Sequence, residues 1–239
     1  MNKSSSELKS MAKGALLGQY GTPILAYLII FAVSFVLNLL LLRLFPYYGL
    51  GSLGSILSYF LCSLIMELLL SLLTVGLQIL LLNMARGYSG NVGDVFFAFR
   101  NQPDKIILYQ LCMVGIFLLC MLPSLAVLVL TAAYSELLFL RVICVLVFLV
   151  DIVFTVSTLL SYVLVPFLYG DEPELGTLDL LRRSKELMRG HRCRYFYLSV
   201  SFLGMTFLAF LSLFIGFLWV APYMNMTYAQ FYRNVRGEI

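Results

Sequence analysis

The sequence predicts an all-α protein, a polytopic transmembrane helix bundle with six spans and with amphipathic interfacial helices on the cytoplasmic side. Two observations predict this class. The chain of 239 residues is 62% hydrophobic and only 12% charged, about half the charged fraction of soluble domains. Its mean hydropathy is +0.96, and its apolar runs exceed the ~18 residues that indicate a membrane span. A soluble core of this size could not bury so much apolar surface.

The apolar runs place six spans within a single integral membrane domain, residues 1–239. We expect the spans at residues 24–42, 56–82, 106–130, 140–168, 195–211 and 217–232. The last apolar stretch, after Arg194, is too long for one crossing of ~20 residues and just long enough for two short ones. A turn at Ser212 to Gly216 is expected, because serine and glycine favour a break. One long helix kinked at Pro222 is the alternative.

The connections between the first four spans are short or amphipathic. Arg43 to Gly54 contains Pro46 and two tyrosines suited to the membrane interface. The polar loop that ends at Lys105 has apolar residues at helical spacing, which predicts a short helix on the membrane surface; they are Val92, Val95, Phe96 and Phe99. A tight turn is expected around Ser135 and Glu136, and Pro123 predicts a kink in the third span.

Residues 4–18 predict an amphipathic helix ahead of the first span. Ser4 and Glu7 have the spacing of a capping box. The apolar positions repeat at helical spacing: Leu8, Met11, Ala12, Ala15 and Leu16. Lys9 and Lys13 flank this stripe, as expected for a helix that lies on an anionic leaflet.

A second amphipathic helix is predicted at residues 174–190, in the hinge between the fourth and fifth spans. Its apolar side carries Leu180, Leu181, Ser184, Leu187 and Met188. Its other side is charged and is a candidate cytoplasmic interaction surface, with Arg182, Arg183, Lys185 and Arg189. Pro173 is tolerated before or within the first helical turn, and Gly190 is a natural terminator. The helix either connects two spans at the interface, or it docks a partner or gates a substrate.

The hinge also carries a pattern that resembles a known family. Its residues are Pro166, Tyr169, Asp171, Pro173, Glu174 and Leu175, and then Arg183, Ser184, Leu187, Met188 and Gly190. An N-terminal group fits as well, made of Glu7, Leu8, Lys9, Ala12, Lys13, Ala15, Leu16 and Gly18. A C-terminal group completes the pattern, with Gly216 to Val220, Pro222 to Met224, Phe231 and Tyr232.

Together these groups resemble the bacterial integral membrane family catalogued as domain of unknown function 975, over nearly the whole chain. One departure is Gly176, which stands where the pattern has a serine. The resemblance implies a polytopic membrane protein without an established activity. It therefore supplies no catalytic residues.

The basic residues predict the orientation. The first segment, the loop before Lys105, the hinge and the C-terminal Arg233 and Arg236 are basic, whereas the alternate connections hold only Arg43 and Arg141. Because Lys and Arg favour the cytoplasmic side, six spans with both termini in the cytoplasm of a plasma-membrane protein are expected. Five spans would place the last two arginines outside.

Two carboxylates lie deep within apolar runs and form a candidate intramembrane polar site: Glu67 in the second span and Asp151 in the fourth. An ionisable group at that depth costs several kcal/mol unless it is paired, protonated or facing water. We expect both to face the bundle interior. Either they are protonated acids that hydrogen-bond between helices, or they form a proton- or cation-coupled site.

Other functional classes have little support. The sequence lacks phosphate-binding, nucleophile-elbow, zinc-protease and dinucleotide motifs, so we expect no enzyme and no cofactor, although a lipid-acting enzyme within the bilayer is not excluded. One histidine and five scattered cysteines argue against a metal site. The net charge of +4 is not a nucleic-acid signature.

Two functions stay open. The first is a transport component, or one that handles lipid or peptide, and it needs a polar path lined by both carboxylates. The alternative is a scaffold or regulator that binds an unnamed partner through its cytoplasmic helices. The expected partners are the bilayer itself and anionic lipid at the cytoplasmic basic residues.

Overall fold

The computed structural model describes residues 3–45, 51–134 and 138–239, and none of these residues forms a strand. The expected all-α class is therefore confirmed. Five segments are long and apolar enough to cross a membrane, which fits a multi-pass membrane protein; they are Gly21–Leu44, Leu53–Ala85, Pro103–Ala133, Phe139–Asp171 and Arg192–Leu211. The expected number of six spans stays a prediction. The turn at Ser135 and Glu136 and the residues Pro46, Tyr47 and Tyr48 lie outside the described residues.

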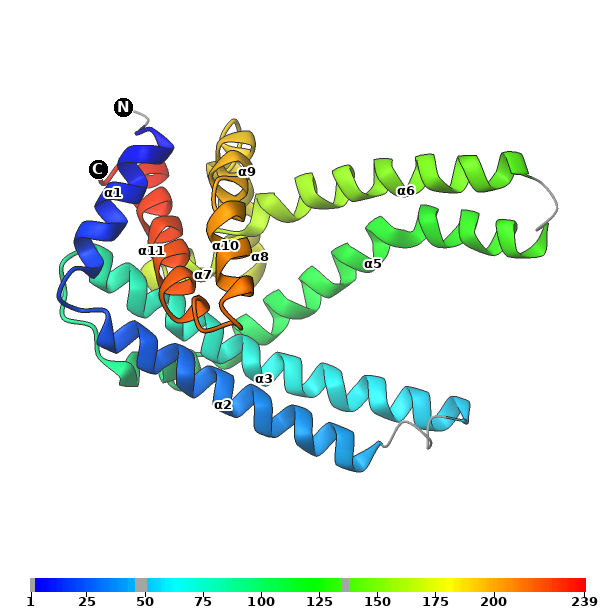
Figure 1. The fold of residues 1–239 in the computed structure, drawn as a ribbon, viewed down its shortest axis with the longest axis horizontal. Coiled ribbons are helices and arrows are strands. Elements are labelled where there is room, and N and C mark those ends of the chain that lie inside the picture. The colour runs from blue at the N-terminus through cyan, green and yellow to red at the C-terminus, as the bar shows by residue number, and fades with distance from the viewer. Residues whose placement is uncertain (1–2, 46–50, 135–137) are drawn as a thin grey trace.

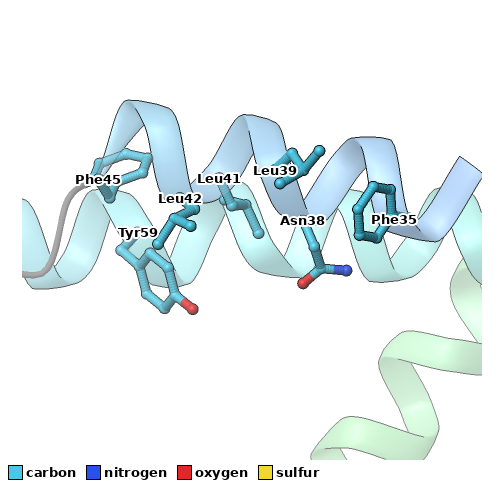
Figure 2. A pocket seen from close by; sticks show the side chains of 7 residues that line it. All are labelled: Phe35, Asn38, Leu39, Leu41, Leu42, Phe45 and Tyr59. Carbon is cyan, nitrogen blue, oxygen red and sulfur yellow. The ribbon is translucent and has the colours of Figure 1, made fainter.

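Two helical hairpins extend from one end of the molecule and separate toward their tips (Figure 1). The first pairs α2 (Gly21–Leu44) with α3 (Leu53–Ala85), and the second pairs α5 (Pro103–Ala133) with α6 (Leu138–Leu159). We call residues 28–70 and 110–159 the arms. Figure 2 shows side chains of α2 and Tyr59 of α3 lining a groove near the tip of the first arm. Most large apolar side chains of the arms are exposed.

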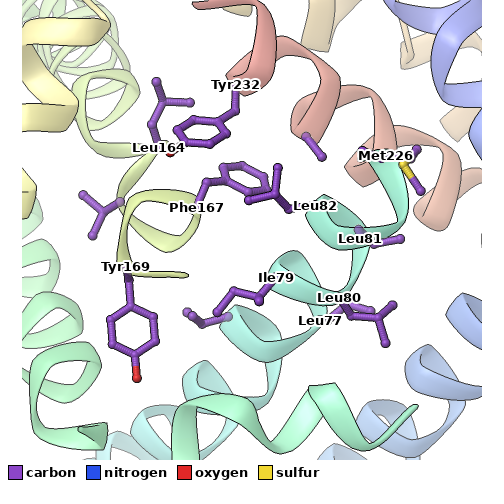
Figure 3. Close-up of a cluster of buried hydrophobic side chains, with 14 of the residues drawn as sticks. Leu77, Ile79, Leu80, Leu81, Leu82, Leu164, Phe167, Tyr169, Met226 and Tyr232 are labelled. Carbon is purple, nitrogen blue, oxygen red and sulfur yellow. The ribbon is translucent and has the colours of Figure 1, made fainter. Parts of the chain in front are cut away.

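The described residues outside the arms and outside the hairpin of residues 202–223 form what we call the base. Its core is built around the second half of α3, against which α7 (Val165–Asp171) and α11 (Phe217–Arg236) pack (Figure 3). Leu77 and Ile79 to Leu82 of α3 meet Phe167 of α7 and Met226 and Tyr232 of α11. The Phe167 and Tyr232 rings stack with centroids 5.2 Å apart. The base is therefore a packed protein core.

The loop after α3 folds back beneath that helix. It forms η2 (Val92–Phe96) and α4 (Phe97–Arg100), with Val95 and Ala98 fully buried. Gly76 permits this contact, because a Cβ at that position would lie 1.9 Å from the carbonyl oxygen of Val95. The predicted surface helix is thus a short helical segment that buries Val95 and Ala98, whereas Phe96 and Phe99 of the predicted apolar side are exposed.

The fourth apolar run is not one straight helix. After α6, the chain passes through η3 (Leu160–Tyr162) and resumes as α7, with Pro166 in the first turn. Proline has no N–H and disturbs the backbone bonds of a helix interior, which accounts for a break at this point. In contrast, Pro123 lies inside α5 without ending it.

The hinge helix α8 (Thr177–Leu187) has the predicted amphipathic pattern. Leu180, Leu181, Ser184 and Met188 are buried, and the Ser184 hydroxyl donates to the Ser161 carbonyl oxygen at 2.8 Å. Gly176 is the N-cap and supplies no side-chain bond. Gly190 has a φ of +81°, as expected for a residue that ends a helix. The apolar side of α8 thus packs on the bundle.

Helix α1 (Ser5–Leu16) has the predicted capping box between Ser4 and Glu7. Its stripe of Leu8, Ala12 and Leu16 is fully buried within the core of the base. The expectation that this stripe rests on a lipid leaflet is therefore wrong, because the stripe packs in the protein core, beside α11 (Figure 1).

The last apolar stretch forms α9 (Arg192–Val200), α10 (Leu203–Leu211) and α11. The chain reverses between Leu211 and Phe217, where Leu213 and Phe214 have positive φ. The expected turn therefore lies where the sequence places it. Pro222 sits inside α11, and no single long helix forms.

Candidate functional site

Asp151 is buried between the two helices of the second arm, with 6% of its surface exposed. Its Oδ2 accepts a hydrogen bond from the Ser124 amide at 2.8 Å and a second, very short one from the Ser124 hydroxyl. Ser124 directly follows Pro123, and a proline disturbs the neighbouring helical bonds. The Asp151 side chain of α6 therefore accepts a hydrogen bond from a backbone amide of α5. The expected interior position of Asp151 is found, with a polar partner in reach.

Glu67 lies elsewhere. It is exposed on α3 in the first arm, and no described residue gives it a hydrogen bond. The expectation that Glu67 also faces the bundle interior is therefore wrong. The structure does not bring the two acids together, because each belongs to a different arm (Figure 1).

Three grooves stand out among the described residues. The groove of Figure 2, about 370 Å³, is lined by α2 and Tyr59; its Asn38 amide donates to its own helix at Ser34. A second groove, about 460 Å³, lies between α5 and α6 and includes Ser124. The third and largest, about 810 Å³, lies between α2 and the turn before α11. None of the three reaches both carboxylates.

The second groove is the best candidate for a ligand site. Apart from Ser124 its lining is apolar, consisting of Met121, Leu125, Leu128, Cys144, Val145 and Phe148. Ser124 also binds Asp151, so the groove has a buried carboxyl behind its wall. An apolar groove with a few convergent polar groups is typical of small-molecule sites.

The basic side of α8 faces away from the bundle. Arg182 and Arg183 make single ion pairs within the helix, to Asp179 at 3.4 Å and to Glu186 at 3.6 Å. Their side chains are 73% and 51% exposed, and Lys185 and Arg189 are exposed as well. Exposed pairs contribute little stability. The four residues therefore form an open surface without a pocket.

A cluster of polar and charged residues, which the sequence did not predict as a group, joins the ends of three helices. Arg86, which follows α3, makes a two-pronged contact with Asp171 of α7 at 2.6 and 2.7 Å. Arg236 of α11 donates to the same carboxylate at 2.7 Å, as does the Tyr232 hydroxyl. Glu238 bonds Arg86 at 2.5 Å and Arg233 at 3.1 Å. We call these six residues the clamp.

The electrostatics of the clamp favour charged side chains. Hydrogen bonds to Asp171 and then to Glu238 raise the pKa of Arg86 above its ordinary value. Burial alone would raise the pKa of Glu238, but hydrogen bonds from Arg86 and Arg233 outweigh burial and lower it. Each carboxylate has an arginine partner. The clamp is therefore suited to holding helices together rather than to proton transfer.

Two sequence signals point toward the clamp. Asp171 belongs to the hinge pattern, and charge bias places Arg86 and Arg236 at the same side of the membrane. Neither signal says which arginine meets the carboxylate, because that depends on how the helix ends pack. In the described residues, no group of three or more His, Cys, Asp or Glu side chains could hold a metal ion.

Comparisons with known proteins add one match. A family model described as "Protein of unknown function (DUF975)" matches residues 1–238. No curated protein and no solved structure matches the chain.

Proposed function

The chain belongs to the family described as protein of unknown function (DUF975), and from this premise we propose that it is a non-enzymatic plasma-membrane component that binds lipid-like ligands. One observation carries the proposal. The groove beside Ser124 lies between α5 and α6 with an almost entirely apolar lining, and its Ser124 binds the buried Asp151. A path for polar solutes through both carboxylates has no support, because Glu67 and Asp151 lie in separate arms.

The dimensions and chemistry of this groove suit an amphiphile. Its volume of about 460 Å³ falls within the range of roughly 300–1,000 Å³ typical of small-molecule sites. The apolar lining fits an acyl chain, and the Ser124–Asp151 pair offers a hydrogen-bonding group at one point. A buried carboxyl in a membrane segment is costly unless it has such a use or a partner.

Retention of lipid by the purified protein tests the proposal. Leu125→Trp fills the groove, whereas the control Leu122→Trp alters an equally exposed leucine of α5 that does not line it. We expect native mass spectrometry to detect less bound lipid on Leu125→Trp and on Asp151→Asn than on the unmodified protein. Leu122→Trp and Glu67→Gln are expected to retain the normal amount. Equal lipid on all four variants contradicts the proposal.

A second candidate function rests on α8. Its outward side presents Arg182, Arg183, Lys185 and Arg189 in exposed positions, which supports contact with anionic lipid headgroups. A peptide of residues 174–190 is expected to float with phosphatidylserine vesicles. Arg182→Gln combined with Arg183→Gln is expected to weaken this flotation. Flotation that is unchanged, or that occurs equally with neutral vesicles, removes this candidate.

A cytoplasmic base is part of the proposal, since the base holds every lysine and arginine except Arg43 and Arg141. Cys193 is an exposed thiol of the base and reports the orientation directly. We expect a membrane-impermeant thiol reagent to modify Cys193 only after cells are permeabilised. Modification in intact cells would place the base outside.

A further inference from the structure

The turn between α10 and α11 exposes an unusually apolar surface. Leu213 is 83% exposed, and its neighbours are also mostly uncovered: Leu211, Phe214, Ile215 and Trp219. We call residues 211–219 the tip. Five large exposed apolar side chains without a charge among them are costly in water. The tip therefore belongs in lipid, and its depth decides whether the hairpin crosses the membrane.

Lys9 of α1 indicates where the helical hairpin formed by α10 and α11 meets the polar membrane interface. Its ammonium group donates to the Ser201 carbonyl oxygen at 3.2 Å and lies 4.2 Å from the centroid of the Phe202 ring. Lysine side chains keep their charged end at the membrane interface. From Ser201 to Leu211 the chain advances ten residues, which is about 15 Å of helix. Because α10 runs across α2 rather than along it (Figure 1), this length is the most by which the tip can lie deeper than Lys9, and it is about half of the ~30 Å hydrocarbon core.

The partner helix α11 gives a similar depth. Tyr223 packs edge-on against Phe202, with ring centroids 5.5 Å apart, so it lies at the same level. Between Phe217 and Tyr223 α11 advances only six residues, or about 9 Å. Neither helix of the pair extends far enough beyond this level to reach the opposite leaflet.

Helix α2 gives an independent measure of the depth of the tip. Tyr27, Leu28 and Phe31 line the largest groove together with Leu213, Phe214 and Ile215 of the tip. Phe31 lies ten residues after the start of α2 at Gly21, about 15 Å along a helix of about 36 Å. The tip thus lies beside the middle of a full-length span and not beside its far end.

The turn forms hydrogen bonds within its own residues, as an environment without water requires. The Ser212 hydroxyl donates to the Ala209 carbonyl oxygen at 2.7 Å and accepts from the Gly216 amide at 2.8 Å. Further backbone bonds join Ile215 to Ser212 and Phe217 to Phe214. A Cβ on Gly216 would lie 2.8 Å from the Ala209 Cα, so only glycine permits this close approach. Internal satisfaction of the backbone is what hydrocarbon demands.

We propose that residues 202–223 form a re-entrant hairpin, which enters the membrane from the base, turns near the bilayer midplane and returns to the same side. Its tip contacts the acyl-chain ends of membrane lipids. The chain then crosses the membrane four times, through α2, α3, α5 and the α6–α7 run. Both termini still lie on one side, as charge bias requires. This inference does not depend on the proposed ligand groove.

The only tryptophan of the sequence, Trp219, lies in the tip and measures its depth without any mutation. Reconstituted protein is mixed with phospholipids that carry a nitroxide quencher either near the headgroup or near the chain end. We expect the chain-end quencher to reduce Trp219 fluorescence more strongly. The reference variant Leu44→Trp/Trp219→Phe puts the probe at the end of α2 and is expected to show the opposite order. If Trp219 follows the same order as that reference, the proposal is overturned.

Cysteine accessibility gives a second test of whether the hairpin crosses the membrane. In a chain whose five natural cysteines are replaced by alanine, single cysteines are introduced one at a time: Leu53→Cys reports the far side of the membrane, and a restored Cys193 reports the side of the base. Leu213→Cys is expected to resist an impermeant thiol reagent applied from either side and to react once detergent is added. Reaction from the same side as Leu53→Cys means that the hairpin crosses completely, which overturns the proposal.

Discussion

Helix α3 runs through both regions of the molecule and shows how they differ. In the arm, Leu53 is 84% exposed and Ile65 is 58% exposed; in the base, Leu80 and Leu81 are fully buried. The two halves are similarly rich in leucine. Hydrophobicity alone therefore does not tell whether a membrane helix meets lipid or protein. The neighbours decide this, because only the base places α7, α11 and η2 around α3.

The largest effect is expected from charges in the base. Leu180 is 1% exposed and Leu187 lies beside it on the buried side of α8. Leu180→Glu combined with Leu187→Glu should cost more than about 4 kcal/mol of folding free energy, because two carboxylates replace buried apolar groups. Little folded protein should be recovered in a size-exclusion assay. Arg182→Gln combined with Arg183→Gln is the matched control. Equal recovery of the two double variants would mean that the apolar side of α8 does not pack on the bundle.

Breaking the clamp should have the next largest effect. Arg86→Ala leaves Asp171, whose side chain is 10% exposed, without its two-pronged partner. Removing one member of a buried ion pair costs about 3 kcal/mol, at the lower end of the known range because Arg86 is partly exposed. Thermal unfolding in detergent measures the loss. Arg182→Ala, at an exposed pair, should change stability by less than about 0.5 kcal/mol; an equal shift for both variants contradicts the role of the clamp.

A glycine pair compares the two regions directly. Gly76→Ala in the base places a Cβ 1.9 Å from the Val95 carbonyl oxygen and should cost about 2 kcal/mol by overpacking. Gly115→Ala in the second arm meets nothing within 4 Å and should be neutral or stabilising, by up to about 1 kcal/mol, through helix propensity. Thermal unfolding of both variants decides. If the arm variant is the less stable one, the arms are packed more tightly than the exposed side chains indicate.

The smallest effect is the pH dependence of the clamp. The pKa of Glu238 is lowered from its ordinary value of 4.5, so its contribution to stability is present above pH 4.5 and is lost as the pH falls through the folded value. The raised pKa of Arg86 keeps that side chain charged at all lower pH values. Stability should therefore stay flat from about pH 8 to about pH 5 and fall below pH 4.5.

Glu238→Gln tests that assignment. The groups that face Glu238 are Arg86 and Arg233, with Asp171 on the far side of Arg86. The variant should lose stability at neutral pH and show a shallower decline in acid than the unmodified protein. An acid decline of unchanged depth would assign the titration to another group.

The sequence predicted the class, the helix stripes and the turn because each depends on local patterns. The stripe of α8 and the capping box of α1 follow from helical spacing alone. Contacts between distant segments were not predicted. Glu67 and Asp151 have similar depths in their runs, but depth does not say which way a side chain points or that the arms separate. The partner of Asp151 was missed for the same reason, since Ser124 belongs to another run.

The bond between the Lys3 amide and the Asn234 side chain joins residues 231 positions apart. Together with the clamp, it makes α11 a requirement for closing the base. The arms can enter the bilayer in turn during translation, but α1 has no α11 to pack against until α11 has left the ribosome. Until then its apolar stripe of Leu8, Ala12 and Leu16 lacks the cover that the finished base gives it.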